Sequence, residues 1–185
     1  MNNISYLLFN HSLTGTNQWD PLPDMNEIRS DFSAVTYGSR VFAIGGFNGT
    51  DVLGGVEQYN SEESVWTPYT SLVTPRSGTR CISALVTTIT TCAHIAWCRS
   101  IVYEDKVYIL GGYDGTSRLR SVECFTPGPP GSRPTWHQVT SSAMGESFQR
   151  EAQVADMLEP RSNFSVAIID NRLIVMGGYR LIPNS

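Results

Sequence analysis

The chain has 185 residues, of which 41% are hydrophobic, 10% aromatic and 16% charged, and this composition excludes a disordered tail, a coiled coil and a collagen-like protein. Thirteen Lys and Arg against seventeen Asp and Glu leave a net charge of −4, so the basic surface expected of a nucleic-acid-binding protein is missing. Four cysteines are too few for a disulfide framework, and no basic region precedes the first apolar run as in a signal peptide. We expect one packed cytoplasmic domain.

Three similar segments recur along the chain. Their glycine pairs stand 66 residues apart, whereas Trp19 and Trp66, like Arg29 and Arg76, stand 47 residues apart. Each of the two 66-residue intervals contains 19 extra residues relative to the matched 47-residue spacing, which accounts for the difference. The sequence therefore predicts a 47-residue repeat with insertions. Each segment is a β-branched and aromatic run that ends in two glycines: Arg40–Gly46, Lys106–Gly112 and Arg172–Gly178.

Each repeat is predicted to form four short strands. In the first repeat, residues 32–37 and 40–46 flank a Gly38-Ser39 turn, and residues 56–59 and a strand headed by Trp66 follow. Such a sheet has two apolar faces, so sheets stacked as blades around an axis would bury both. The expected units are a partial blade at 4–22, blades at 32–70 and 76–140, and a partial blade at 161–180, with insertions at about 80–99 and about 141–156.

The two insertions differ in character. Residues 81–98 carry no charge, but their threonines, serine and histidine make a poor membrane span, so no membrane contact is expected. We interpret this repeat-breaking segment as foreign to the mature domain, for example retained non-coding sequence. In the second insertion, helical spacing predicts a short amphipathic helix over Met144, Phe148, Ala152, Ala155 and Leu158.

The order of hydrophobic strand, Gly-Gly, Asp-Gly, Ser-Val-Glu, Trp and Pro-Arg-Ser resembles the kelch repeat. The segment from Ile101 to Thr116, with Leu119 to Glu123, is similar to the kelch-like (BTB-BACK-kelch) family in particular. This resemblance implies an all-β fold, a partial kelch β-propeller of about three to four blades, two of them complete. Because the BTB and BACK domains are absent, we expect a fragment that reaches a cullin only through those missing domains.

The resemblance further implies a non-catalytic protein-protein interaction module, like the substrate-recognition domain of a cullin-RING E3 ubiquitin ligase adaptor. Actin binding is the first alternative, and a metal-dependent oxidase is a remote one. We expect no cofactor, catalytic residue or metal ligand, since His11, His94 and His137 occupy unrelated positions in the repeat. A zinc site at Cys81, Cys92, His94 and Cys98 lacks a standard spacing.

Several residues are expected to be structural. The paired glycines would let a neighbouring backbone approach closely, and they lack the Lys-Ser/Thr of a phosphate-binding loop. The large aromatic residues would pack between blades. These structural residues are Gly45, Gly46, Gly111, Gly112, Gly177 and Gly178, together with Trp19, Trp66, Trp136 and Tyr59.

Three arginines, Arg29, Arg76 and Arg161, recur at one repeat position, each followed by Ser. One interpretation is structural, with guanidinium groups that cap loop carbonyls. The other, which we favour, follows from the resemblance: the arginines converge on one propeller face and bind an acidic segment of a partner. Weaker partner-binding candidates in the loops after the glycine pairs are Asn48, Asp114 and Thr116.

Overall fold

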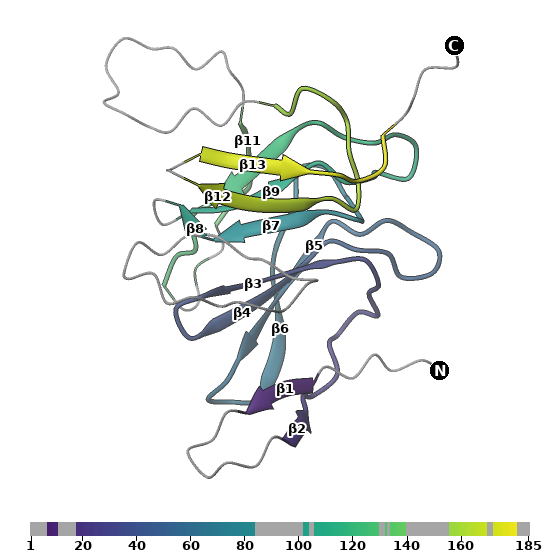
Figure 1. Ribbon diagram of the computed structural model, residues 1–185. Coiled ribbons are helices and arrows are strands. Elements are labelled where there is room, and N and C mark those ends of the chain that lie inside the picture. The colour runs from purple at the N-terminus through teal and green to yellow at the C-terminus, as the bar shows by residue number, and fades with distance from the viewer. Residues whose placement is uncertain are drawn as a thin grey trace.

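The computed structural model describes residues 7–10, 18–83, 102–103, 106–129, 132, 134–139, 156–169 and 172–180. These residues form thirteen strands, all in antiparallel pairs, and no helix (Figure 1). The predicted all-β class is therefore confirmed. Within the described residues, no helix is long and apolar enough to cross a membrane.

The first complete sheet has the order β3-β4-β5-β6. Its hairpin between β3 and β4 turns at Gly38, whose φ of 60° lies in the left-handed region that glycine adopts without strain. A register shift between Val56 and Glu57 marks a bulge where β5 pairs with β6. The strands are β3 (Ser33–Tyr37), β4 (Arg40–Ile44), β5 (Gly55–Asn60) and β6 (Val65–Ser71).

The second sheet repeats this order as β7-β9-β10-β11, and the short strand β8 also pairs with β9. The predicted insertion at 80–99 needs a correction at its start, because its first four residues form β7 and pair with β9 from Arg80↔Leu110 to Ser83↔Val107. Residues 84–101 lie outside the described residues. The strands are β7 (Arg80–Ser83), β8 (Val102–Tyr103), β9 (Lys106–Leu110), β10 (Val122–Phe125) and β11 (His137–Val139).

Two further sheets have two strands each. Near the N-terminus, β1 (Leu7–Asn10) pairs with β2 (Gln18–Pro21), and Phe9 lies opposite Trp19. Near the C-terminus, β12 (Ser165–Ile169) pairs with β13 (Arg172–Met176). Of the helix predicted between Met144 and Leu158, only residues 156–158 are described, and they are not helical.

The sheets stack through their apolar faces, with β7 in contact with both β3 and β12 (Figure 1). Between the two complete sheets, Phe42 and Ile44 pack in one buried cluster with Ile109, Phe125 and Trp136. The rings of Phe42 and Phe125 meet nearly edge to face at 5.8 Å, and those of Phe125 and Trp136 are 4.4 Å apart. Removing these side chains from water stabilises the stack of blades.

Candidate partner-binding face

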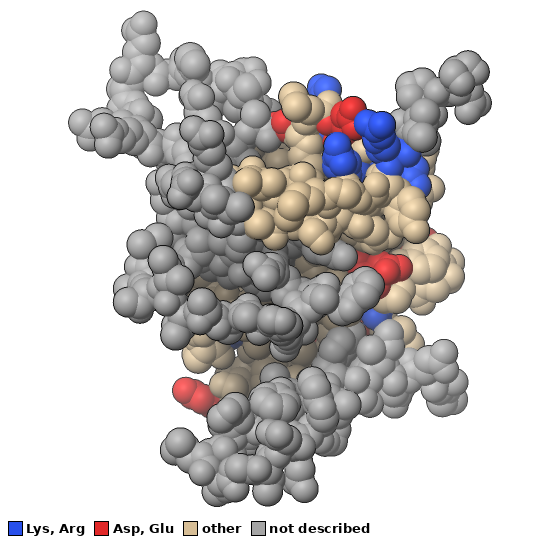
Figure 2. All heavy atoms as spheres, in the orientation of Figure 1, with Lys and Arg blue, Asp and Glu red and all other residues tan. Residues whose placement is uncertain are grey.

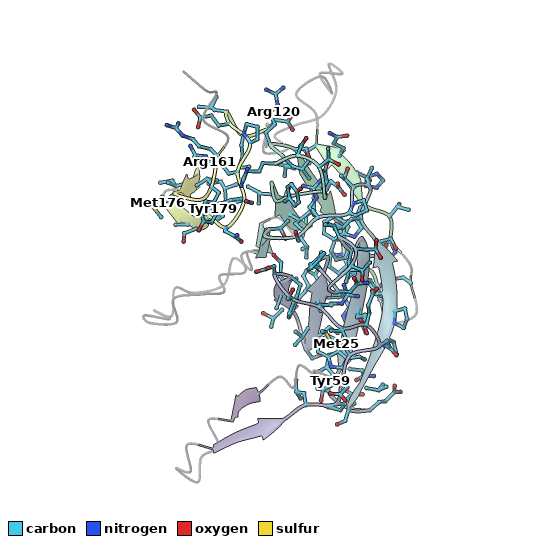
Figure 3. All side chains as sticks on the ribbon, turned by 90° about the vertical axis from the view of Figure 1, so that its right-hand side faces the viewer. Met25, Tyr59, Arg120, Arg161, Met176 and Tyr179 are labelled. Atoms are coloured by element: carbon cyan, nitrogen blue, oxygen red, sulfur yellow. The ribbon has the colours of Figure 1, made fainter. Side chains whose placement is uncertain are left out.

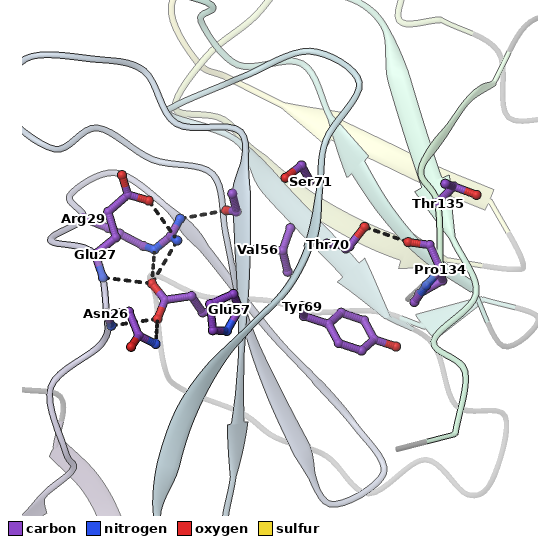
Figure 4. A pocket seen from close by; sticks show the side chains of 12 residues that line it. Asn26, Glu27, Arg29, Val56, Glu57, Tyr69, Thr70, Ser71, Pro134 and Thr135 are labelled. Carbon is purple, nitrogen blue, oxygen red and sulfur yellow. Dashed lines mark hydrogen bonds and ion pairs between the residues drawn. The ribbon is translucent and has the colours of Figure 1, made fainter. Parts of the chain in front are cut away.

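Arg29 lies inside the first sheet rather than on its surface, since its side chain is 1% exposed. Its Nη1 donates hydrogen bonds of 2.8 Å to the carbonyl oxygens of Gly45 and Gly55, at the adjoining ends of β4 and β5. Its Nε and Nη2 donate to Oε1 of Glu57 at 3.2 and 2.9 Å (Figure 4). The guanidinium group therefore makes these hydrogen bonds within its own blade.

The carboxylate of Glu57 is held from the opposite side by Asn26, whose backbone N–H and Nδ2 both donate to Oε2 at 2.7 Å. Burial by itself raises the pKa of Glu57, but the hydrogen bonds from Asn26 and Arg29 outweigh burial and lower the pKa below its ordinary value. Glu57 is therefore ionised at neutral pH and balances the charge of Arg29.

Arg76 repeats the arrangement in the second sheet. Its Nη1 donates to the carbonyl oxygens of Gly111 and Ser121 at 3.0 and 3.1 Å, and its Nη2 bonds to Oε1 of Glu123. Glu123 also accepts hydrogen bonds from the backbone N–H groups of Val73 and Thr74. Both members of this ion pair are buried.

These contacts correct the favoured prediction for Arg29 and Arg76. The two side chains do not form a partner-binding surface, because carboxylates and carbonyls of the same chain already fill their donor sites and exclude solvent. The structural alternative, in which arginines cap loop carbonyls, describes them. The sequence analysis missed the buried acids Glu57 and Glu123.

Arg161 differs from the other two arginines. Its Nη1 donates to the carbonyl oxygen of Gly177 at 2.8 Å, as the others do at their first paired glycine. Its Nη2 lies 3.3 Å from Glu159, and the side chain is 27% exposed. A role in partner binding remains a prediction for this residue alone of the three.

The first two glycine pairs lie where the loops that carry Arg76 and Arg161 cross the preceding blade. Gly46 donates a hydrogen bond to the carbonyl oxygen of Arg76 at 2.9 Å, and Gly112 donates to that of Arg161 at 2.8 Å. The φ angles of Gly46 and Gly112 are 108° and 100°, and a Cβ atom at Gly46 would come within 2.7 Å of the oxygen of Ser30. Both the conformation and the close approach require glycine.

The residue after each glycine pair is aromatic and faces a serine. Phe47, Tyr113 and Tyr179 form isolated bridges with Ser30, Ser77 and Ser162, the serines that follow the three arginines. We define the loop face as residues 30–31, 47–52, 77–78, 113–118, 162–163 and 179–180. The sequence signal for this surface was the aromatic residue directly after each Gly-Gly.

Hydrogen bonds join the loop face across the three sheets. The backbone N–H of Gly78 donates to the carbonyl oxygen of Asp31 at 2.9 Å, and the N–H of Asn163 donates to that of Gly78 at 2.8 Å. Asp31, Gly78 and Asn163 occupy one repeat position, and all three have φ between 50° and 58°. Asp, Gly and Asn tolerate this left-handed conformation best, so the joint between blades is encoded locally.

Asn48, Asp114 and Thr116 lie on the loop face. Oδ1 of Asn48 accepts from the backbone N–H groups of Thr50 and Asp51, and Oδ1 of Asp114 accepts from those of Thr116 and Ser117. The N–H groups of Ser117 and Thr116 lower the pKa of Asp114. Asn48 and Asp114 thus organise their turns, and Thr116 is exposed.

Cations concentrate beside the C-terminal sheet (Figure 2). Arg161 and Arg180 both contact Glu159, and the Arg120 side chain contacts Asp156 (Figure 3 labels Arg120 and Arg161). The hydrogen bond and the charge of Arg180 lower the pKa of Glu159. Tyr179, next to Arg180, is 65% exposed. An exposed ring and an arginine therefore lie side by side at this end of the loop face.

A cleft of about 480 Å³ runs beside β6 at the outer rim (Figure 4). Its lining includes Tyr69 and Thr70 of one blade and Pro134 of the next, and Thr70 Oγ1 donates to the carbonyl oxygen of Pro134 at 2.6 Å. The described residues bring together no group of three or more His, Cys, Asp or Glu side chains able to hold a metal ion.

The core predictions concern Tyr59, Trp66, Trp136 and Trp19. Tyr59, Trp66 and Trp136 are buried, and the Trp66 indole N–H donates to the carbonyl oxygen of Pro23. The backbone of Trp19 lies in β2, and its side chain is outside the described parts of the structure.

Repeated four-stranded antiparallel blades, each fixed by an arginine and a Gly-Gly pair, define a β-propeller of partial extent. The Kelch motif matches residues 28–72 and 98–142, so the chain carries two copies of this motif.

The curated relatives include Kelch-like proteins, and their identity to this chain is low. The chain is 30% identical to human Kelch-like protein 33 over 110 residues, which cover 59% of this chain and 17% of that protein. It is 27% identical to rat Kelch-like protein 36, and the match covers 88% of this chain and 29% of that protein. It is 26% identical to the Caenorhabditis elegans spermatocyte protein spe-26, and the match covers 58% of this chain and 15% of that protein. The chain thus spans less than a third of the length of each.

Proposed function

We propose that the chain is a protein-binding module that captures its partner on the loop face. The observation that carries this proposal is a continuous, hydrogen-bonded surface across three sheets that presents exposed tyrosines and arginines. Tyr113 and Tyr179 offer ring area beside polar groups, and aromatic and arginine side chains dominate protein-protein binding energy. Backbone bridges hold both tyrosines in place, so little conformational entropy is lost on binding.

An acidic segment is the partner chemistry that we propose. Arg180 is exposed and shares Glu159 with Arg161. Arg118 is half-buried on the loop face, and its Nε is a buried atom without a hydrogen-bond partner in the described structure. Carboxylates of a partner would supply charge-assisted hydrogen bonds to these guanidinium groups. Arg29 and Arg76 support the surface from below and make no contact with the partner.

A peptide-display selection tests this proposal directly. We expect selected peptides to be rich in Asp and Glu and to bind the purified chain in a fluorescence-anisotropy titration. Arg180→Ala and Tyr113→Ala should each weaken that binding by about tenfold or more, as central contacts do. Arg120→Ala, which removes an exposed arginine outside the loop face, is the matched control. Equal affinity of all four proteins would refute the assignment of the face.

At the level of the whole protein, we propose a substrate-receptor role in a cullin-RING ubiquitin ligase adaptor, supported by the similarity to Kelch-like proteins. Actin binding is the competing role. Co-sedimentation of the chain with filamentous actin, weakened by Tyr113→Ala, would favour the cytoskeletal role over the ligase role.

A further inference from the structure

The two-stranded sheets are complementary halves of one blade. In the complete sheets the strands run inward to outward as β3-β4-β5-β6, and β3 contacts β7. The sheet β12–β13 corresponds to the inner half, because Ser165↔Met176 repeats the pairing Ser33↔Ile44 and β12 contacts β7. The sheet β1–β2 corresponds to the outer half, because Phe9↔Trp19 repeats the pairing Tyr59↔Trp66.

The apolar clusters show the same complementarity. Between the complete sheets, Val107, Ile109, Phe125 and Trp136 of one blade meet two groups from the preceding blade. The outer group includes Tyr69 and Leu72, and the inner group includes Phe42 and Ile44. A complete junction between blades therefore needs both groups.

The face of the first complete sheet has only the outer group. Val41, Ala43, Tyr59 and Trp66 meet Leu22 and Met25, which stand 47 residues before Tyr69 and Leu72. Met25 lies beside Tyr59 in Figure 3. Among the described residues, no inner-strand side chain equivalent to Phe42 or Ile44 joins this cluster.

The missing inner group is present at the other end of the chain. Ile174 and Met176 occupy the positions of Phe42 and Ile44 in the paired registers. Ile44 is 0% exposed and its equivalent Leu110 is 1% exposed, whereas Met176 is 51% exposed. Figure 3 shows Met176 at the upper left, well apart from Met25 and Tyr59. Within the described residues of one copy, Met176 therefore makes no contact with the incomplete face of the first sheet.

We propose that two copies of this chain close into one six-bladed ring. The outer edge of β13 in one copy pairs with β1 of the other, so that two half sheets form one blade at each of two identical junctions. The described residues of each copy contribute two complete sheets and two halves, equivalent to three blades. Three blades fall below the four to eight of closed propellers and nine exceed it, so the ring takes two copies related by a two-fold axis.

The known pairings fix the register of the new ladder. Val41↔Tyr59 and Phe42↔Gln58 in the first blade correspond to Leu173↔Phe9 and Ile174↔Leu8 between the copies. The backbone N–H of Gly45 donates to the carbonyl oxygen of Gly55 at the start of β5. Because hydrogen-bonded and non-hydrogen-bonded pairs alternate along an antiparallel ladder, Phe42 is at a non-hydrogen-bonded position. Ile174, its equivalent, would occupy the same kind of position. Side chains at such positions approach most closely across a ladder.

Mass measurement is the first test. By multi-angle light scattering after gel filtration, the full chain should have twice the 20.4 kDa mass of one copy. Met176→Asp should give a single-copy mass with an unchanged circular dichroism spectrum, because Met176 is exposed in one copy and buried at the junction. Leu158→Asp is the matched control at a 98% exposed position and should remain a dimer. A wild-type monomer, a ladder of larger species or a dimeric Met176→Asp protein would overturn the proposal.

Disulfide trapping tests the register independently of folding effects. Copies carrying Ile174→Cys are mixed with copies carrying Leu8→Cys and incubated with oxidised glutathione. We expect a covalent dimer on a non-reducing gel, formed in higher yield than in either variant alone. Leu173→Cys in place of Ile174→Cys should lower the yield several-fold, because its side chain points to the other face of the sheet. Equal yields from the two pairings would overturn the proposed register.

Discussion

Arg76 and Arg161 begin alike in sequence and end in different surroundings. Both follow Pro, precede Ser and donate to the carbonyl oxygen of the first paired glycine. Arg76 also reaches a carboxylate on a third strand and is fully buried, whereas the sheet after Arg161 has two described strands and leaves the side chain 27% exposed. The same motif thus forms a buried ion pair in a complete blade, whereas in the incomplete blade the arginine stays partly exposed.

The largest expected effect comes from breaking the buried ion pair between Arg76 and Glu123. Arg76→Ala leaves the Glu123 carboxylate buried without its cation, and this should lower the free energy of unfolding by about 3–5 kcal/mol. Urea unfolding followed by Trp fluorescence measures the change. A loss below about 1 kcal/mol, the range of exposed ion pairs, would contradict the burial of the pair.

A double variant shows whether the charge or the packing matters. Arg76→Met with Glu123→Leu removes both charges and keeps apolar volume, so it should regain most of the lost stability, because an apolar pair replaces a buried ion pair at little cost. A double variant as unstable as Arg76→Ala would indicate that the hydrogen bonds to Gly111 and Ser121 dominate.

The glycine pairs give the next largest contrast. Gly112→Ala should destabilise the chain by about 3 kcal/mol, since backbone strain and overpacking each cost about 1–3 kcal/mol. A Cβ there would meet Thr79 and lie 2.7 Å from the Ser77 oxygen. At a concentration where the chain is monomeric, Gly177→Ala meets nothing within 4 Å and should cost about 1 kcal/mol, from its φ of 71° alone. Equal losses in thermal unfolding would refute the role of close approach.

The carboxylate of Glu57, in the ion pair with Arg29, predicts that the stability of the chain depends on pH. Its folded-state pKa is lowered below 4.5, so the ionised form of Glu57 stabilises the fold above that value and the benefit is lost as pH falls through the folded-state pKa. Glu57→Gln should therefore be less stable than the wild type at about pH 7 by about 1–3 kcal/mol. The difference between the two proteins should shrink at about pH 3. A constant difference across urea melts at both pH values would contradict this.

The smallest effect is expected at Arg161. Arg161→Ala removes a partly exposed ion pair with Glu159 and one hydrogen bond to Gly177, so the chain should lose less than about 1 kcal/mol in the same urea assay. A loss equal to that of Arg76→Ala, measured at a concentration where the chain is monomeric, would erase the contrast between the two arginines.

The repeat spacing was sufficient to predict the fold, because the 47-residue interval and the two-residue turn at Gly38 depend on local sequence. The burial of Tyr59, Trp66 and Trp136 followed from aromatic residues at matched repeat positions. The repeat spacing did not predict the role of Arg29 and Arg76, because the carboxylates that pair with them lie 28 and 47 residues further along the chain. A usable signal existed in Glu57 and Glu123, charged residues within apolar strands, which burial allows only with a partner.

The arginine loop has a consequence for how such chains change in evolution. The backbone of Arg76 bonds to Gly46 and Leu53 of one sheet, while its side chain bonds to Gly111 and Glu123 of the next. The arginine and its glutamate therefore travel together in one sequence unit, and that unit also carries the attachment to its neighbour. Duplication or loss of a whole unit leaves the buried ion pair of every other unit intact, so blade number can vary by recombination without a second, compensating mutation.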